Sequence, residues 1–266
     1  WSPDGTCLLT VVRGAGMHVM ELPSDLYTGD SMLTSRPVNP LTPAVSVPEG
    51  GLIYDFCWYP GMNSGNPATC CWAASGHEGP IHLWDAFTGD LRCTYRGYNN
   101  VDELEAAISV AFSADGQNIF CGYKKNVKIF NTSRPGREYI EYPSQHPASC
   151  LVASLAQPGV VAIGHKGGIT TLAFSLDGTR LYSGARKDNE IICWDLRVPG
   201  RPLFCLPRQC NTNQKISIDL SRDGRWLVSG GTDGKVQVWD MPLHNDCCNG
   251  VSLHPYRPIM ATSSGQ

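Results

Sequence analysis

The sequence has 266 residues, with 21 lysines and arginines against 24 aspartates and glutamates, which gives a formal net charge of -3. This balance does not indicate a nucleic-acid binder, so any such role must depend on a local patch. The 28 glycines and 19 prolines suit many short strands and turns, no apolar run approaches the roughly 18 residues of a membrane span, and no signal-peptide pattern opens the sequence. We therefore expect a soluble chain.

The first elements in chain order are incomplete. Residues 1–9 (WSPDGTCLL) match the turn between the first and second strands of a four-stranded repeat, so the chain begins inside a repeat. Residues 17–21 (MHVME) predict the third strand. Residues 22–50 are rich in Pro, Ser and Thr and predict a long surface excursion, with a strand signal only at 45–47.

Two further repeats follow. The second opens at 53–59 (IYDFCWY) and closes at 81–85 (IHLWD). The third opens after 98–107 (YNNVDELEAA) and closes at 127–131, where Phe130 stands in the position that tryptophan has in the second. These alternating apolar runs predict strands.

The most complete repeat spans residues 164–197. It contains an apolar strand, an Asp-Gly pair that suits a tight turn, a second strand ending in Ser-Gly, a polar hairpin and a final Trp-Asp. This order is typical of one blade of a WD40 β-propeller.

Four side chains of this blade are expected to form a buried hydrogen-bonded network. In it Trp194 donates to Ser183, and Ser183 is linked through His165 to Asp188. The Ser, His and Asp could also be interpreted as a hydrolase triad, but nucleophilic catalysis requires an exposed serine and an oxyanion hole. We therefore predict a structural network and no enzyme.

The spacing of the closing strands shows an anomaly. Trp84 and Phe130 are 46 residues apart, and Trp194 and Trp239 are 45 apart, which is one blade in each case. Phe130 and Trp194 are 64 apart, too far for one blade and too close for two. We infer a fourth blade that lacks its third and fourth strands, roughly 25 residues if the period is kept, and we suspect residues missing from the sequence near 164.

The last elements complete the predicted ring. A sixth blade covers 215–240, a second shortfall occurs at 240–247, and residues 251–265 predict the inner strands of a seventh blade. We therefore expect residues 1–266 to form a single all-β WD40 propeller domain. Seven blades fit best, with six or eight as alternatives, and the two chain ends are expected to meet in one blade and close the ring.

Twelve cysteines are present without regular spacing. The adjacent pairs at 70–71 and 247–248 do not form the Cys-x-x-Cys pairs of zinc knuckles, and Cys121, Cys150 and Cys193 lie inside apolar strand patterns. We therefore expect buried, reduced thiols in an intracellular protein, with no metal and no cofactor.

Several segments carry a likeness more specific than the repeat itself. Together they resemble the telomerase Cajal body protein 1 family over nearly the whole chain: IYDFCWY, PIHLWDAFTGDLR, YNNVDELEAA, FCGYKKNVKIFNTSRPGRE, GHKGGIT with SGARKDNEIICWDLR, TNQKISIDL and NDCCNGVSLHPYRPIMATSSGQ. Members of that family are WD-repeat proteins that bind the CAB box of small Cajal body RNAs. The short fourth blade departs from the family pattern.

The resemblance implies a non-catalytic scaffold that recognises a CAB-box loop in H/ACA-type RNAs, telomerase RNA among them in vertebrates. It implies association with the dyskerin-containing H/ACA protein core and targeting of the particle to Cajal bodies in the nucleus. It also implies a monomer within a larger particle, without membrane contact.

Candidate RNA-contacting residues occupy the loops that join second to third strands and one blade to the next, which lie on one face of a propeller. RNA recognition uses cations for phosphates and planar groups for splayed bases. The candidates are Tyr98, Asn99, Tyr123, Lys124, Lys125, Lys166, Arg186, Lys187, Asn213, Gln214 and Lys215. Each alone is more readily explained as a solvated loop residue, and their expected convergence on one face favours RNA.

The opposite face is expected to carry Asp-Gly turns with Arg180, Arg222 and Arg225. Tight turns explain the Asp-Gly pairs, and a protein contact there is an alternative role for the arginines. For the whole chain, the main alternative is a generic WD40 protein-interaction platform without RNA contact.

Overall fold

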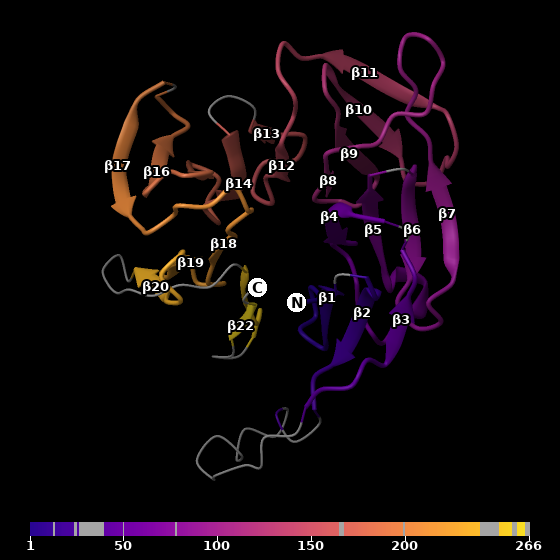
Figure 1. The fold of residues 1–266 in the computed structure, drawn as a ribbon, viewed down its shortest axis with the longest axis horizontal. Helices are drawn as coiled ribbons and strands as arrows, with labels where there is room; N and C mark the ends of the chain where they lie inside the picture. The colour runs from indigo at the N-terminus through magenta and orange to yellow at the C-terminus, as the bar shows by residue number, and fades with distance from the viewer. Residues whose placement is uncertain are drawn as a thin grey trace.

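The structure is a computed structural model in which strands form nearly all the regular structure (Figure 1). It describes residues 1–12, 14–23, 26, 40–49, 51–77, 79–164, 168–198, 200–239, 250–256 and 260–263. The elements, in chain order, are β1 (Cys7–Val12), β2 (Gly16–Glu21), β3 (Val45–Val47), β4 (Ile53–Trp58), the 3-10 turn η3 (Pro67–Thr69), β5 (Cys71–Gly76), β6 (Ile81–Asp85), β7 (Leu91–Tyr95), β8 (Ser109–Phe112), β9 (Asn118–Gly122), β10 (Asn126–Asn131), β11 (Tyr139–Pro143), β12 (Cys150–Ala153), β13 (Val161–Gly164), β14 (Ile169–Phe174), β15 (Arg180–Ala185), β16 (Glu190–Asp195), β17 (Pro202–Pro207), β18 (Ile218–Leu220), β19 (Leu227–Gly230), β20 (Val236–Trp239), β21 (Gly250–Leu253) and β22 (Met260–Ser263).

The strands build antiparallel sheets from consecutive elements, set side by side around a common centre (Figure 1). Three sheets have four strands, namely β4 to β7, β8 to β11 and β14 to β17. The sheets β1-β2-β3 and β18-β19-β20 have three. This arrangement confirms an all-β propeller, because each of these five sheets is one blade of consecutive antiparallel strands.

The predicted count of seven blades is wrong, because the described residues form five blades of three or four strands. The other two sheets, β12-β13 and β21-β22, are two-stranded pairs. For β12-β13 the reason lies in the chain itself, since β14 opens the next blade at Ile169, too soon after Gly164 for two outer strands.

Ring closure within one blade is not confirmed. The two ends of the chain do touch, since the indole N–H of Trp1 donates to the Ser252 carbonyl at 3.2 Å and His254 Nε2 lies 2.6 Å from the Gly5 carbonyl oxygen. Within the described part of the chain, however, β1 pairs only with β2, and β21 only with β22.

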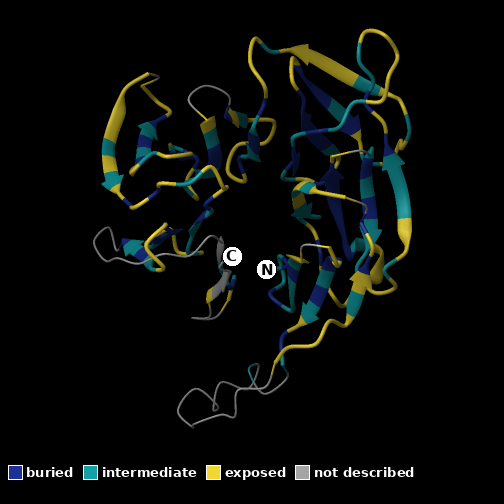
Figure 2. Ribbon diagram, viewed as in Figure 1, coloured by how far each residue is buried: buried dark blue, intermediate teal, exposed yellow. Residues whose placement is uncertain are grey.

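The core lies between neighbouring blades. All six residues of β5 are buried, whereas four of the five residues of the outer strand β11 are exposed (Figure 2). Strand β5 is buried on both faces because Cys71 and Ala73 pack in one core cluster and Trp72 and Ala74 in another. Phe130, in the predicted tryptophan position, is fully buried between the rings of Tyr95 and Tyr139, with centroid distances of 5.7 and 5.3 Å.

The Asp-Gly turns predicted from the sequence are present. In the turn between β14 and β15, Gly178 has φ +68°, a left-handed conformation that glycine adopts without steric cost. The Asp177 carboxylate accepts hydrogen bonds from the Ser175 hydroxyl and from the backbone and hydroxyl of Thr179, and these bonds lower the pKa of Asp177 to about 2. The turn is therefore fixed by its own side chains.

The cysteines among the described residues are free thiols. Six are buried, namely Cys70, Cys71, Cys121, Cys150, Cys193 and Cys210, whereas Cys205 is exposed. Burial raises the pKa of Cys71 to about 11 and that of Cys150 to about 12. Cys247 and Cys248 lie outside the described residues. A search of the described residues finds no helix long and apolar enough to cross a membrane.

Candidate nucleic-acid interface

The strongest candidate surface is the hairpin between β15 and β16, which exposes Arg186 and Lys187. The backbone N–H of Arg186 donates to the Gly168 carbonyl at 3.0 Å, and that of Lys187 donates to the Thr212 carbonyl at 3.1 Å. Lys187 has φ +50°, which is uncommon for a residue with a side chain. The backbone of the hairpin is thus hydrogen-bonded to the connection before β14 and to the connection before β18.

Arg208, which the sequence analysis did not single out, lies beneath this hairpin. Its side chain is buried, its Nη2 donates to the Ala185 carbonyl at 2.8 Å, and its Nε donates to the Asp188 carbonyl at 3.3 Å. Its Nη1 is buried without a hydrogen-bond partner. A Cβ on Gly184 would lie 2.9 Å from Nη2, so a larger residue there would require the guanidinium to shift.

Among the described residues no carboxylate forms an ion pair with Arg208. Burial lowers the pKa of Arg208, while the neighbouring Cys210 and Asp188 act in the opposite direction. Arginine remains protonated in proteins because its pKa is above about 12. The hairpin therefore carries two exposed cations above a third, buried one. Arginine in an otherwise apolar strand ending (PLFCLPRQC) is the sequence signal that could have revealed it.

Asn213 and Gln214 are exposed in the connection from β17 to β18 and lie close in sequence to Thr212, which contacts the hairpin. The structure thus brings four of the predicted residues to one place. Amide side chains next to cations are suited to hydrogen bonds with base edges and sugar hydroxyls.

Lys215, predicted to be on the RNA-contacting rim, is held elsewhere. Its Nζ lies 2.8 Å from Asp55 Oδ1 on β4, and β4 and β18 stand on opposite sides of the centre in Figure 1. Although the Lys215 side chain is 45% exposed, desolvation by its surroundings lowers its pKa, but the Asp55 carboxylate more than offsets this and raises the pKa above its ordinary value. We therefore leave Lys215 out of the candidate surface.

The turn between β9 and β10 divides its predicted residues. Lys124 and Lys125 are exposed, but Tyr123 is fully buried. The Tyr123 ring packs under Lys128, whose Nζ lies 4.8 Å from its centroid, and the hydroxyl approaches Gly97 so closely that a Cβ there would be 2.3 Å away. Tyr123 is thus a core residue and is not available for stacking on a base.

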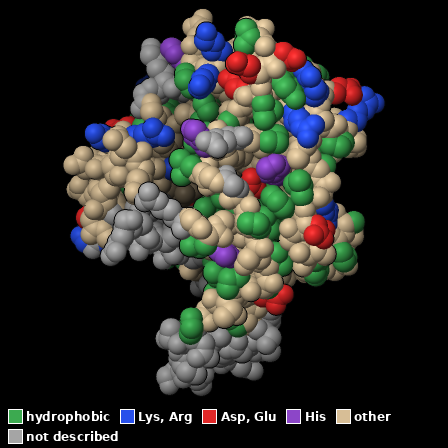
Figure 3. Space-filling view, turned by 45° about the vertical axis from the view of Figure 1, so that its right-hand side comes forward, with side chains coloured by type: hydrophobic (Ala, Val, Ile, Leu, Met, Phe, Trp, Pro, Cys, Tyr) green, Lys and Arg blue, Asp and Glu red, His purple; other side chains and the backbone are tan. Residues whose placement is uncertain are grey.

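Tyr98 and Asn99 follow β7, on the far side of the ring from β15 and β16 (Figure 1). The guanidinium of Arg137 stacks 3.8 Å from the centroid of the Tyr98 ring. Asn99 Oδ1 accepts hydrogen bonds from the backbone N–H groups of Val101 and Glu103. Asn99 thus fixes its own loop, and Tyr98 packs against the turn between β10 and β11. On the face drawn in Figure 3, basic and acidic side chains are interspersed at the upper right.

The predicted structural network is confirmed at its first link, since Trp194 Nε1 donates to Ser183 Oγ at 2.8 Å. His165 and Lys166 lie outside the described residues. The Asp188 carboxylate accepts a hydrogen bond from the backbone N–H of Glu190 at 3.2 Å.

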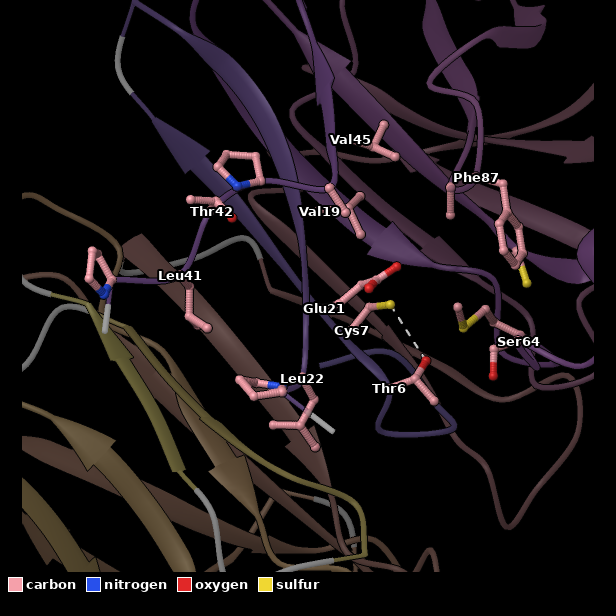
Figure 4. A pocket seen from close by; sticks show the side chains of 17 residues that line it. Thr6, Cys7, Val19, Glu21, Leu22, Leu41, Thr42, Val45, Ser64 and Phe87 are labelled. Carbon is pink, nitrogen blue, oxygen red and sulfur yellow. Dashed lines mark hydrogen bonds between the residues drawn. The ribbon is translucent and has the colours of Figure 1, made fainter. Parts of the chain in front are cut away.

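A cavity of about 800 Å³ lies beside β1, β2 and the segment 40–45 (Figure 4). Its lining mixes prolines and aliphatic side chains with Cys7, Glu21 and Ser64, and the Thr6 hydroxyl lies 3.5 Å from Cys7 Sγ. Burial raises the pKa of Cys7, which disfavours the reactive thiolate. The cavity contains none of the predicted RNA-contacting residues.

Two segments of the chain are similar to a known repeat family. The family model described as WD domain, G-beta repeat matches residues 157–195 and 201–240. These two segments of the chain are therefore WD40 repeats. WD40 propellers are typically non-catalytic scaffolds, and the matched family is not an enzyme family.

The WD40-repeat chain is similar along its whole length to proteins named telomerase Cajal body protein 1. It is 48% identical to the homolog from Drosophila melanogaster over 303 positions and 43% identical to that from Homo sapiens over 310 positions. It spans 56% of each of these relatives. A guanine nucleotide-binding protein negative regulator 1 from Schizosaccharomyces pombe is 24% identical over 90% of the chain and 69% of its own length.

The aligned lengths exceed the 266 residues of the WD40-repeat chain, so the relatives contain positions within the aligned region that this chain does not have.

Proposed function

We propose that this WD40-repeat protein is a non-catalytic RNA-binding scaffold that recognises a CAB-box-type loop in H/ACA small Cajal body RNAs and targets the particle to Cajal bodies in the nucleus. Two relatives carry telomerase and the Cajal body in their names, which supports this class of RNA particle. A telomerase RNA and the dyskerin-containing H/ACA core are the proposed partners.

One observation carries the location of the RNA site: the exposed pair Arg186 and Lys187 lies above the buried guanidinium of Arg208, whose Nη1 has no hydrogen-bond partner among the described residues. Phosphate groups are the proposed partners of these cations, because backbone contacts to Lys and Arg dominate affinity for nucleic acids. Asn213 and Gln214 are the proposed contacts to bases or sugars.

The exposed Lys124 and Lys125 are proposed as peripheral phosphate contacts, and Lys166 keeps its proposed role from the sequence. Tyr98 and Asn99 are proposed only as supports of the loop after β7, because the Asn99 amide is engaged by Val101 and Glu103 and the Tyr98 ring by Arg137.

The test is binding of a fluorescein-labelled CAB-box hairpin RNA, followed by anisotropy at several salt concentrations. The double variant Arg186→Glu with Lys187→Glu is expected to weaken binding at least tenfold. The slope of log Kd against log salt concentration is expected to fall by the amount that corresponds to about two phosphate contacts. Its thermal unfolding is expected to match that of the parent protein, because both side chains are exposed.

The matched control is Arg201→Glu, a charge reversal of an exposed arginine at the opposite end of the strands, which is expected to change the RNA affinity less than twofold. Equal affinity for the CAB-box hairpin and for a hairpin with a scrambled loop would contradict sequence recognition. Absence of RNA binding altogether would leave the protein-interaction platform as the function.

A further inference from the structure

A second surface lies at the opposite ends of the strands from the Arg186-Lys187 hairpin. It is a groove of about 690 Å³ between the sheet β18-β19-β20 and the pair β21-β22, which neighbour each other in Figure 1. Its inner lining is aliphatic and includes Val228, Val238 and Leu253. The rim carries Arg222, Trp226 and Tyr256.

The turn on this rim contains residues that the fold does not require. In three turns of the same type, at 113–118, 175–180 and 221–226, a serine hydroxyl donates to the carboxylate of the following Asp, and that carboxylate accepts a backbone N–H two residues later. The serine, aspartate and glycine therefore suffice for the turn. Only the turn at 221–226 adds two arginines and a tryptophan, as SRDGRW.

These additional side chains stack in pairs. The Arg222 guanidinium lies 4.0 Å from the centroid of the Tyr256 ring, and that of Arg225 lies 4.8 Å from the Trp226 ring. Tyr256 remains 59% exposed. Within the described part of the chain no carboxylate pairs with Arg222, since the nearby Asp223 is engaged inside its own turn. The rim thus presents positive charge beside an apolar groove.

The floor of the groove is held in place from two sides. The backbone N–H of Leu253 donates to Asp219 Oδ2 at 2.8 Å. His254 is buried, accepts the Tyr256 backbone N–H on Nδ1 at 3.1 Å and donates from Nε2 to the Gly5 carbonyl oxygen, so its ring is the neutral Nε2–H tautomer. Tyr256 is therefore positioned before any partner arrives, which lowers the entropic cost of binding.

We infer that this groove binds a peptide segment in which apolar or aromatic side chains are flanked by acidic residues. The aliphatic floor provides the burial that gives affinity, and Arg222 on the rim pairs with a carboxylate through charge-assisted hydrogen bonds. A strand of RNA fits less well, because stacking on bases needs uncovered aromatic faces, and one face of each ring is covered by a guanidinium. This role is independent of the proposed RNA site.

The experiment uses the 266-residue chain and a fluorescein-labelled peptide of sequence EEDFLDE, with the neutral peptide QQNFLNQ as its partner. The acidic peptide is expected to bind saturably, with at least tenfold higher affinity than the neutral one and with weaker binding at high salt. Arg222→Glu is expected to reduce the affinity at least tenfold, and Arg222→Lys less, since lysine keeps the charge but not the planar stacking.

Two control variants separate this groove from the RNA site. Arg201→Glu and the double variant Arg186→Glu with Lys187→Glu are expected to bind the acidic peptide within twofold of the parent protein. Matching thermal unfolding of Arg222→Glu and the parent excludes a folding defect, since Arg222 is exposed. The inference is overturned if the acidic peptide does not saturate up to 1 mM, if the neutral peptide binds equally well, if Arg222→Glu has no effect, or if single-stranded RNA displaces the peptide from the groove.

Discussion

The inner strands β4 and β14 are each linked to the inner strand of another blade by one side-chain hydrogen bond, but the acceptor is a carboxylate in β4 and a hydroxyl in β14. Each departs from regular pairing near its start, between Ile53 and Asp55 in β4 and between Ile169 and Thr171 in β14. In each strand, the second of these residues accepts a backbone N–H from the inner strand of another blade. Asp55 accepts from Val110 at 3.1 Å, and Thr171 accepts from Ile218 at 3.3 Å.

The difference is the second carboxylate oxygen of Asp55, which binds Lys215 across the ring. The tryptophans on the third strands of these two blades, Trp84 and Trp194, also have different acceptors. Trp194 donates to the hydroxyl of Ser183, whereas Trp84 donates to the carboxylate of Glu49, which comes from the connection before β4. Propeller geometry thus fixes where an acceptor is needed, and a carboxylate at that place can bind a second group as well.

The largest effect is expected from Glu49→Ala. Glu49 is 9% exposed, accepts from Trp84 Nε1 at 2.5 Å and lies 2.6 Å from His82 Nδ1, so its loss leaves two ring nitrogens without their acceptor. We expect unfolding by urea to show a loss of about 3 kcal/mol. Glu49→Gln, which keeps one acceptor oxygen, is the matched control and is expected to lose less. A cost for Glu49→Ala no greater than that of Ser183→Ala would contradict the comparison.

A smaller effect is expected from Asp55→Thr, which gives β4 the residue that β14 has. The hydroxyl still accepts from Val110, but the Lys215 ammonium loses its partner, and because the Lys215 side chain is 45% exposed it regains water. We expect a loss of about 1 to 2 kcal/mol at pH 7.

The pH dependence of this loss sharpens the test. Because Asp55 raises the pKa of Lys215 in the folded state, the ion pair contributes fully below the unfolded pKa of about 10.4 and is lost as the pH rises through the folded value. The stability difference between parent and Asp55→Thr is therefore expected to stay constant from about pH 7 to 9 and to shrink above about pH 10.5. A difference that grew with alkaline pH would refute the pairing.

The smallest effect is expected from Ser183→Ala. Trp194 is only partly buried, so its indole N–H can turn to water when the hydroxyl is removed. We expect a loss of about 1 kcal/mol in urea unfolding and no change in RNA affinity. Loss of RNA binding with unchanged stability would show that this serine acts in recognition rather than in the blade.

The sequence predicted the features that depend on local spacing. The Asp-Gly turns, the strand at 169–174 and the Trp194 to Ser183 hydrogen bond all follow from one repeat unit. Blade number could not be predicted correctly, because the spacing from Phe130 to Trp194 signals a shortened blade but not how the remaining strands pair.

The long-range contacts carried no local signal. Lys215 and Asp55 are 160 residues apart, and Glu49 ends a Pro- and Ser-rich segment that has little pattern of its own. Tyr123 was predicted on the surface for a different reason. The segment GYKKN resembles a polar loop, but the Tyr123 side chain is fully buried. Arg208 escaped notice because burial of an arginine is decided by the packing of two connections around it.

Lys128 in the third blade is a fully buried amine, so its chemical reactivity depends on opening of the blade. Its ammonium is fully enclosed between the rings of Tyr123 and Tyr139 and the carboxylates of Glu105 and Glu141, only a few residues from the exposed Lys124 and Lys125. An amine-reactive label would therefore modify the two surface lysines at once and reach Lys128 only when the blade opens. The labelling rate of Lys128 therefore measures how often the third blade opens locally.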